Sequence, residues 1–138
     1  MIDFYSETNF EFTSEEITSR WISDIITSEG FILGDITYVF CDDEYLHKLN
    51  VQFLDHDTLT DIISFDYSLG KEIHGEIYIS IERVKENAAD FNVDFDSELN
   101  RVIIHGVLHY CGYKDKTDEE QKTMREKENQ ALVRLKFL

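Results

Sequence analysis

The stretch RVIIHGVLHYCGYKDK, residues 101–116, decides how this chain folds and what it can bind, because it combines the most apolar run of the sequence with metal-binding residue types. His105 and His109 are four residues apart within it. On a helix, side chains at this spacing share one face, with Cβ atoms about 5–6 Å apart. Two imidazoles placed in this way can bind one metal ion, as they do in the HExxH helix of metalloproteases.

A third candidate ligand follows the predicted helix. Gly112 comes three residues after His109, where a glycine can end a helix and reverse the chain. Asp115 lies three residues further on and can return over the face that carries the histidines. Two histidines and one carboxylate leave a fourth position for water, as a catalytic zinc site requires. His105, His109 and Asp115 are therefore the predicted zinc ligands and, through the metal, the predicted catalytic residues.

The two histidines also have a simpler explanation, since histidines on a core helix are often only hydrogen-bonded core residues. A metal is favoured because an unpaired imidazole would be costly in such an apolar run. The residue after the first histidine is Gly106, where HExxH metalloproteases carry the Glu that serves as general base. No separate general base is identified, so the metal itself would have to activate water, a chemistry that suits phosphodiester cleavage.

Hydrophobic patterning around this helix predicts an α/β (α+β) fold, with roughly four strands in a mixed sheet and about five helices. Residues 1–138 are predicted to form a single compact domain, because no repeat or flexible linker divides them. Strands are predicted where β-branched and aromatic residues cluster, over residues 2–5, 36–40, 62–67 and 75–80. Helices are predicted after five capping positions, namely Thr13, Asp42 or Asp43, Ser80, Asp96 or Ser97, and Thr117.

Composition restricts the compartment and the partners. The 138 residues include 29 Asp and Glu, 13 Lys and Arg and no Pro, for a net charge of −16. The two cysteines form no CxxC pair, the N-terminus shows no secretory signal, and no apolar run approaches the roughly 20 residues that span a bilayer. A cytoplasmic protein with reduced thiols and no membrane partner is expected.

Three motifs together resemble the YbeY family of bacterial metallo-endoribonucleases. HGVLHYCGY, residues 105–113, followed by Asp115, is similar to the family pattern HGxLHxxGYDH. TDIISF, residues 60–65, is similar to TDVLSF, and GEIYIS, residues 75–80, to GDIxIS. The resemblance spans about residues 36–135. It implies a zinc-dependent, single-strand-specific endoribonuclease that acts in 16S rRNA 3′-end maturation and late-stage ribosome quality control.

The chain departs from the family pattern at two places. Asp115 stands where the family has its third histidine, which adds a negative charge, makes bound water less acidic and admits harder metals such as Mn²⁺. The family's loop arginine, in a YR pair, is replaced by Leu54. Lys48, or the pair Lys114 and Lys116, is expected to take over phosphate positioning. RNA contacts are expected from Arg101, Lys114, Lys116 and Ser64. Asp61 and Ser64 could line the cleft, or serve only in turn capping and strand hydrogen bonding.

Charge is distributed unevenly along the chain. Residues 101–138 hold eight Lys and Arg against six Asp and Glu, whereas residues 1–61 hold two against fourteen. Free RNA is therefore expected to bind weakly over a small basic patch, with a shallow salt dependence. The predicted partners are rRNA, the small ribosomal subunit and a ribosome-associated protein. Two other functions remain open, a ribosome-assembly binding factor with a structural metal site and a metzincin-like protease, although Gly106 argues against the protease.

Overall fold

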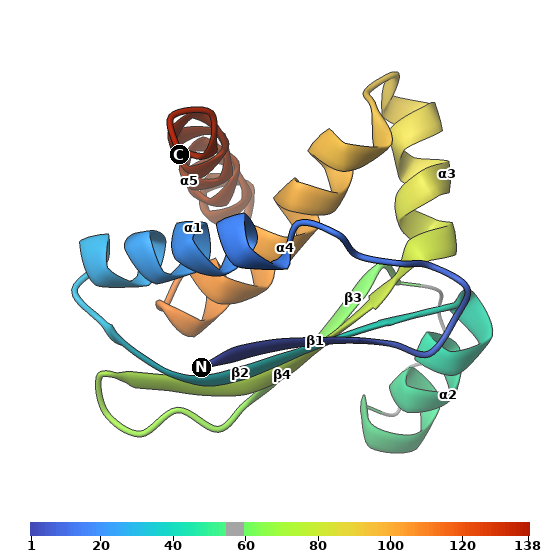
Figure 1. Cartoon of the computed structure of the whole chain (residues 1–138), viewed down its shortest axis with the longest axis horizontal. Coiled ribbons are helices and arrows are strands. Elements are labelled where there is room, and N and C mark those ends of the chain that lie inside the picture. Colours follow the sequence, from blue (N-terminus) through green and yellow to red (C-terminus); the bar gives the residue numbers. More distant parts are fainter. Residues whose placement is uncertain (55–59) are drawn as a thin grey trace.

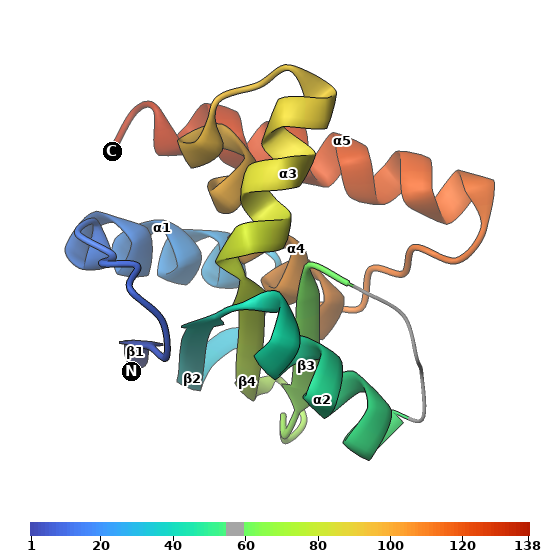
Figure 2. The same cartoon turned by 90° about the vertical axis from the view of Figure 1, so that its right-hand side faces the viewer.

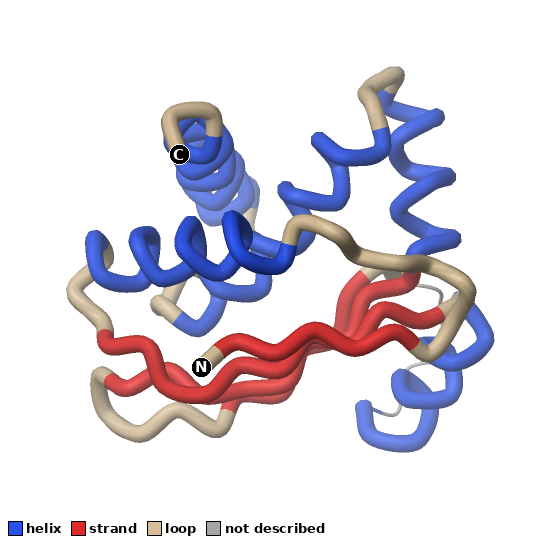
Figure 3. Tube along the Cα trace, in the orientation of Figure 1, coloured by secondary structure: helices blue, strands red, loops and turns tan. Residues whose placement is uncertain are grey.

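A four-stranded mixed sheet forms the base of the computed structural model, which describes residues 1–54 and 60–138 (Figures 1 and 3). The strands lie in the order β1 (Ile2–Ser6), β2 (Ile32–Cys41), β4 (Glu72–Ser80) and β3 (Ile62–Asp66). The β1–β2 and β2–β4 pairs are parallel, whereas β3 pairs with β4 in the antiparallel sense. The predicted fold class is confirmed.

Helices cover the two faces of the sheet unequally. α1 (Glu15–Ser28), α4 (Phe95–Tyr110) and α5 (Asp118–Leu135) lie over one face, and α4 is between α5 and the sheet (Figure 1). α3 (Ile81–Phe91) continues directly from β4 at the edge of this layer, and α2 (Asp43–Leu54) lies on the opposite side (Figure 2). None of the described helices is both long and apolar enough to cross a bilayer.

The main core lies between α4 and the sheet. Ile36, Tyr38 and Phe40 alternate along β2 and are fully buried beneath the helices, as the two-residue period of a strand requires. Two tyrosines also tie α4 to the sheet through hydrogen bonds. The Tyr38 hydroxyl donates to the Ile103 carbonyl at 2.9 Å, and the Tyr110 hydroxyl donates to the Phe65 carbonyl at 2.9 Å.

The residues that cap the observed helices agree only in part with the caps predicted from the sequence. Thr117 and Glu120 form the expected capping box of α5, and Ser80 caps α3. The capping box at Thr13 is wrong, because Ser14 is the N-cap of α1 and makes no side-chain cap bond. The caps proposed at Asp96 or Ser97 are also wrong. Asp94 caps α4 instead, because its extended backbone lets its carboxylate accept from the Ser97 amide at 2.7 Å.

Two strands begin earlier than predicted, and one of them is β4, which starts at Glu72 rather than Gly75. β2 starts at Ile32 rather than Ile36, because a register shift between Leu33 and Ile36 lets the strand continue through the Gly-Asp pair that was expected to break it. Gly34 is needed there, since a Cβ at this position would lie 2.5 Å from the Ile73 carbonyl oxygen.

We expect Gly75→Ala to lower the free energy of unfolding by about 1–3 kcal/mol, because overpacking cannot be relieved where the main chain is in the way. A Cβ on Gly75 would lie 2.7 Å from the Phe65 carbonyl oxygen and would also press on the Tyr110 hydroxyl. Urea denaturation measures the loss. Gly106→Ala is the comparison variant and should cost less, because only the ends of the Ile77 and Ile62 side chains lie in its way. A larger loss for Gly106→Ala would contradict this reasoning.

Candidate metal centre

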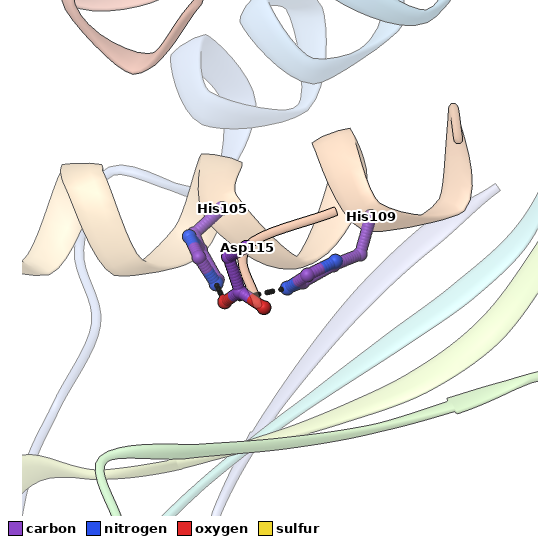
Figure 4. A group of neighbouring side chains, drawn as sticks. All are labelled: His105, His109 and Asp115. Atoms are coloured by element: carbon purple, nitrogen blue, oxygen red, sulfur yellow. Dashed lines mark hydrogen bonds and ion pairs between the residues drawn. The ribbon is translucent and has the colours of Figure 1, made fainter. Parts of the chain in front are cut away.

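α4 and the turn that follows it bring the three predicted metal ligands together (Figure 4). The rings of His105 and His109 project from the same side of the helix, with their centroids 4.5 Å apart. Gly112, with φ of +99°, reverses the chain after the helix, and Asp115 returns toward the two rings as predicted. The Asp115 Oδ2 atom lies 3.2 Å from the Nε2 atom of each histidine.

This donor set fits a divalent metal. In a tetrahedral site with bonds of about 2.0–2.1 Å, neighbouring ligand atoms are roughly 3.3–3.4 Å apart. The two 3.2 Å separations between imidazole nitrogen and carboxylate oxygen are close to that spacing. All three side chains are only partly buried, so one side of the group stays open to solvent. The arrangement can hold one ion and leave a position for water or substrate.

A buried glutamate orients the first histidine. The Glu128 Oε2 atom is 2.7 Å from His105 Nδ1, and its Oε1 atom accepts from Arg101 Nη1 at 2.9 Å. Such outer carboxylates set the tautomer and the angle of a metal-binding imidazole. The sequence-based interpretation missed Glu128. The available signal was its place on the buried side of α5, between Met124 and Ala131, where a charged residue requires a partner.

The second histidine is oriented by the turn. His109 Nδ1 lies 2.8 Å from the Tyr113 carbonyl oxygen. The Tyr113 hydroxyl in turn donates to Glu29 at the end of α1 at 2.6 Å, and Lys127 from α5 bonds the same carboxylate at 3.2 Å. With both Nδ1 atoms engaged, both Nε2 atoms are left facing Asp115. Contacts from α1 and α5 thus hold the turn that carries the third ligand.

The charge state of the metal-free site follows from these contacts. Burial by itself would lower the pKa of His105, but the hydrogen bond with Glu128 and the nearby carboxylates of Asp115 and Asp61 raise that pKa above its ordinary value. Burial by itself would raise the pKa of Glu128, yet its bonds with His105 and Arg101 lower it. The imidazolium form of His105 is therefore favoured more than in a free histidine, and metal binding competes with this proton because it needs the neutral ring.

The four side chains predicted to contact RNA differ in how far they are already engaged within the fold. Arg101 is near the site, but its guanidinium already bonds Glu128 and the Asn129 side chain. Lys114 and Lys116 are exposed on either side of Asp115 in the sequence. Ser64 lies on β3 and its side chain hydrogen-bonds to Tyr110, so it has a role within the fold. RNA binding by these four side chains stays a prediction.

Two further predicted features can be placed. Asp61 lines the same pocket as His105 and Asp115, so it is near the site. Leu54, at the position of the family's loop arginine, is the last residue of α2, and the residues that follow it, 55–59, lie outside the described part of the chain.

Gly106 shows why the helix differs from an HExxH helix. A Cβ at this position would lie 2.9 Å from Ile77 Cδ1 and 3.2 Å from Ile62 Cδ1, so the position faces the sheet and not the ligands. A glutamate there would be buried in the core rather than reach water at the metal.

The fold and the ligand group together define a small α+β domain with the site of a metal-dependent hydrolase.

Comparisons with known proteins identify the family. The family model described as endoribonuclease YbeY matches residues 2–136. Relatives named endoribonuclease YbeY include one from Flavobacterium johnsoniae, 57% identical over 96% of each chain. Another, from Flavobacterium psychrophilum, is 61% identical over 96% of this chain and 94% of its own. The solution structure of a Thermotoga maritima protein, 29% identical, has a TM-score of 0.72 over 98% of this chain and 89% of that one. The chain belongs to the YbeY family of endoribonucleases.

Glu128→Gln should weaken zinc binding about 10- to 100-fold, the usual cost of losing an outer carboxylate on a metal-binding histidine. Competition with a chromophoric chelator measures this affinity without any cleavage assay. Glu126→Gln is the matched control, because it removes the same charge from an exposed position on α5. Equal affinities of the two variants would show that Glu128 does not orient His105.

The metal-free protein should also lose stability as pH rises. Because the pKa of His105 is raised above 6.5 in the folded state, its pairing with Glu128 stabilises the fold fully below that pH. This contribution is then lost as pH rises through the raised pKa. Urea denaturation of chelator-treated protein should show the decrease, and Glu128→Gln should remove most of it. The same pH dependence in both proteins would contradict the assignment.

Proposed function

We propose that this endoribonuclease holds zinc with His105, His109 and Asp115 and uses it to cleave single-stranded RNA. The observation that carries the proposal is the orientation of the two histidines. Each engages a protein partner through Nδ1 and turns Nε2 toward Asp115, which is how neutral imidazoles are presented to a metal. Membership of the YbeY family makes the protein a hydrolase that acts on RNA.

The chain's own residues supply binding and orientation. Bound zinc would stabilise negative charge on phosphate oxygens and lower the pKa of water. His105 and His109 would hold the ion from the rigid α4 helix, while Asp115 would complete the ligand set from the turn. Lys114 and Lys116, exposed beside Asp115, would contact the RNA backbone on either side of the cleaved bond.

Zinc is proposed because two imidazoles and one carboxylate form a common catalytic zinc site. The carboxylate distinguishes this site from one built of three histidines. Its charge weakens the polarisation of bound water and suits harder ions, so Mn²⁺ or another divalent metal is the alternative occupant. Metal content after purification, measured alongside activity restored by each ion, distinguishes these possibilities.

We further propose that the substrate is 16S rRNA at its 3′ end, on the small ribosomal subunit in the cytoplasm, and that the enzyme also acts in late-stage ribosome quality control. The charge distribution supports an assembled substrate over free RNA. A chain with net charge −16 repels RNA over most of its surface, and only the segment that carries the ligands is net positive. A ribosome-associated protein would supply the remaining affinity.

His109→Ala should reduce cleavage of a single-stranded RNA covering the 16S 3′ end by more than about 100-fold, since a lost ligand costs more than a lost outer partner. Gel analysis of end-labelled RNA measures the rate with zinc-loaded protein, and chelator treatment should abolish it. His74→Ala is the control, because this histidine lies on β4 and pairs with Glu72 instead of the metal ligands.

Undiminished cleavage by the chelated enzyme or by His109→Ala would overturn the metal role. Equal cleavage of single-stranded RNA and a fully paired duplex would overturn the proposed strand specificity. Zinc-dependent hydrolysis of casein would instead restore the protease alternative.

A further inference from the structure

A pocket of about 330 Å³ adjoins the metal centre. It is enclosed by residues of α3, α4 and α5 and by the start of β3, and it shares His105 and Asp115 with the ligand group. Its volume is at the lower end of the range of about 300–1,000 Å³ that is usual for small-molecule sites. The metal ligands His105 and Asp115, with Glu128 and Arg101 behind them, account for only part of its lining.

Two polar side chains that line this pocket make no hydrogen bond within the described part of the chain. Within residues 1–54 and 60–138, neither the Glu98 carboxylate nor the Asn87 amide has a hydrogen bond. Glu98 is only 6% exposed. Its unbonded oxygens are nevertheless not fully enclosed, because within the described chain Arg83 Nε is the one fully enclosed side-chain polar atom that has no partner. The Glu98 oxygens therefore open into the pocket. A buried carboxylate without a donor is costly, so this position favours a ligand that donates.

The electrostatics of the pocket select against an anion. Four carboxylates line it, from Asp61, Glu98, Asp115 and Glu128, and both arginines in the lining lie within 4 Å of Glu128. Burial and the nearby charge of Asp61 raise the pKa of Glu98, and the opposing effect of Arg101 and Arg125 does not offset them. A phosphate would be repelled, whereas a neutral group with N–H donors would be accepted.

The remaining walls suit a flat ring. Ile62 and Val102 contribute apolar surface to the lining. Phe91, at the end of α3, also lines the pocket and is 59% exposed, so its ring is accessible to a ligand in the pocket. Proteins that read single-stranded RNA stack its unpaired bases on exposed aromatic rings and bond their Watson–Crick edges with polar side chains.

We propose that this pocket is a subsite for one RNA base beside the cleaved bond, in which Glu98 accepts a hydrogen bond from an exocyclic amino group. Cytosine, adenine and guanine carry such a group, whereas uracil presents a carbonyl oxygen where cytosine has its amino group. Phe91 stacks on the base and the Asn87 amide bonds its edge. The subsite deepens the proposed cleavage of single-stranded RNA and rests on it.

Nucleoside binding tests the subsite without requiring cleavage. Cytidine, adenosine and uridine carry no phosphate, so none can bind through charge to a metal. In NMR titrations of the zinc-loaded full chain, cytidine and adenosine should shift the Asn87 side-chain amide and Val102 methyl signals. Their affinity should exceed that of uridine roughly 5- to 100-fold, the discrimination that one well-formed base contact provides.

Variants separate the roles of the side chains. Glu98→Gln keeps the shape but adds an N–H donor, so it should reduce or reverse the preference for cytidine over uridine. Phe91→Leu should weaken all three nucleosides, because it removes the ring at an exposed position where folding does not depend on it. Glu126→Gln, an exposed acid on α5, is the matched control and should leave the order unchanged.

Equal affinities for cytidine and uridine, or a preference that survives Glu98→Gln, would overturn the proposal. Shifts of the same signals by Mg²⁺ but by none of the nucleosides would overturn it in favour of a cation site. If nucleosides bind as expected but RNA is not cut, the subsite stands as a base-binding pocket while the proposed cleavage fails. If RNA is cut without base preference beside the cleaved bond, in wild type and Glu98→Gln alike, the subsite fails alone.

Discussion

The close packing of α4 against the sheet is the constraint on which the rest of the structure depends. Gly106 allows it, since any side chain there would meet Ile77 and Ile62, and the Tyr110 hydroxyl secures it by bonding the Phe65 carbonyl. With one side of the helix committed to the core, His105 and His109 project together from another side of it, where Asp115 meets them (Figure 4). Gly106 stands where HExxH metalloproteases carry their general base. It is thus required by the packing of this fold, and it also leaves the helix without that base.

The candidate metal-binding group, on one helix and the turn after it, is also supported by other elements. Glu128 on α5 bonds His105, while Glu29 on α1 and Lys127 on α5 hold the turn whose carbonyl bonds His109. These contacts reduce the freedom of the two rings and of Asp115 before any ion binds, so less conformational entropy is lost on binding. They also explain why acidic residues surround a site intended for an anionic substrate. The carboxylates here orient cationic and metal-binding groups, and the pocket beside them favours a neutral base over a phosphate.

Much of the fold could be predicted from local sequence. The strands, the helices and the caps at Ser80 and Thr117 follow from patterns within a few residues, and the structure confirms them. One error occurs where a longer-range contact decided the outcome, whereas the wrong caps of α1 and α4 are local errors. The strand β2 continues through its Gly-Asp pair because β4 lies beside it and accommodates a register shift. The start of α4 depends on the backbone conformation of Asp94. Local sequence leaves this start ambiguous, because Asp94, Asp96 and Ser97 are all residue types that cap helices.

The sequence by itself determined that the candidate ligands His105, His109 and Asp115 come together, because helical spacing and one turn at Gly112 are local properties of the chain. Three separate motifs in order were also enough to indicate the family. Only the tertiary structure decided which groups surround the ligands. Glu128 is 23 residues from His105, Glu29 is 84 from Tyr113, and the charge of Asp61, just before β3, acts on Glu98 of α4. No local pattern encodes such pairings, since they arise from how whole elements pack, and these distant partners shape both the metal centre and the pocket beside it.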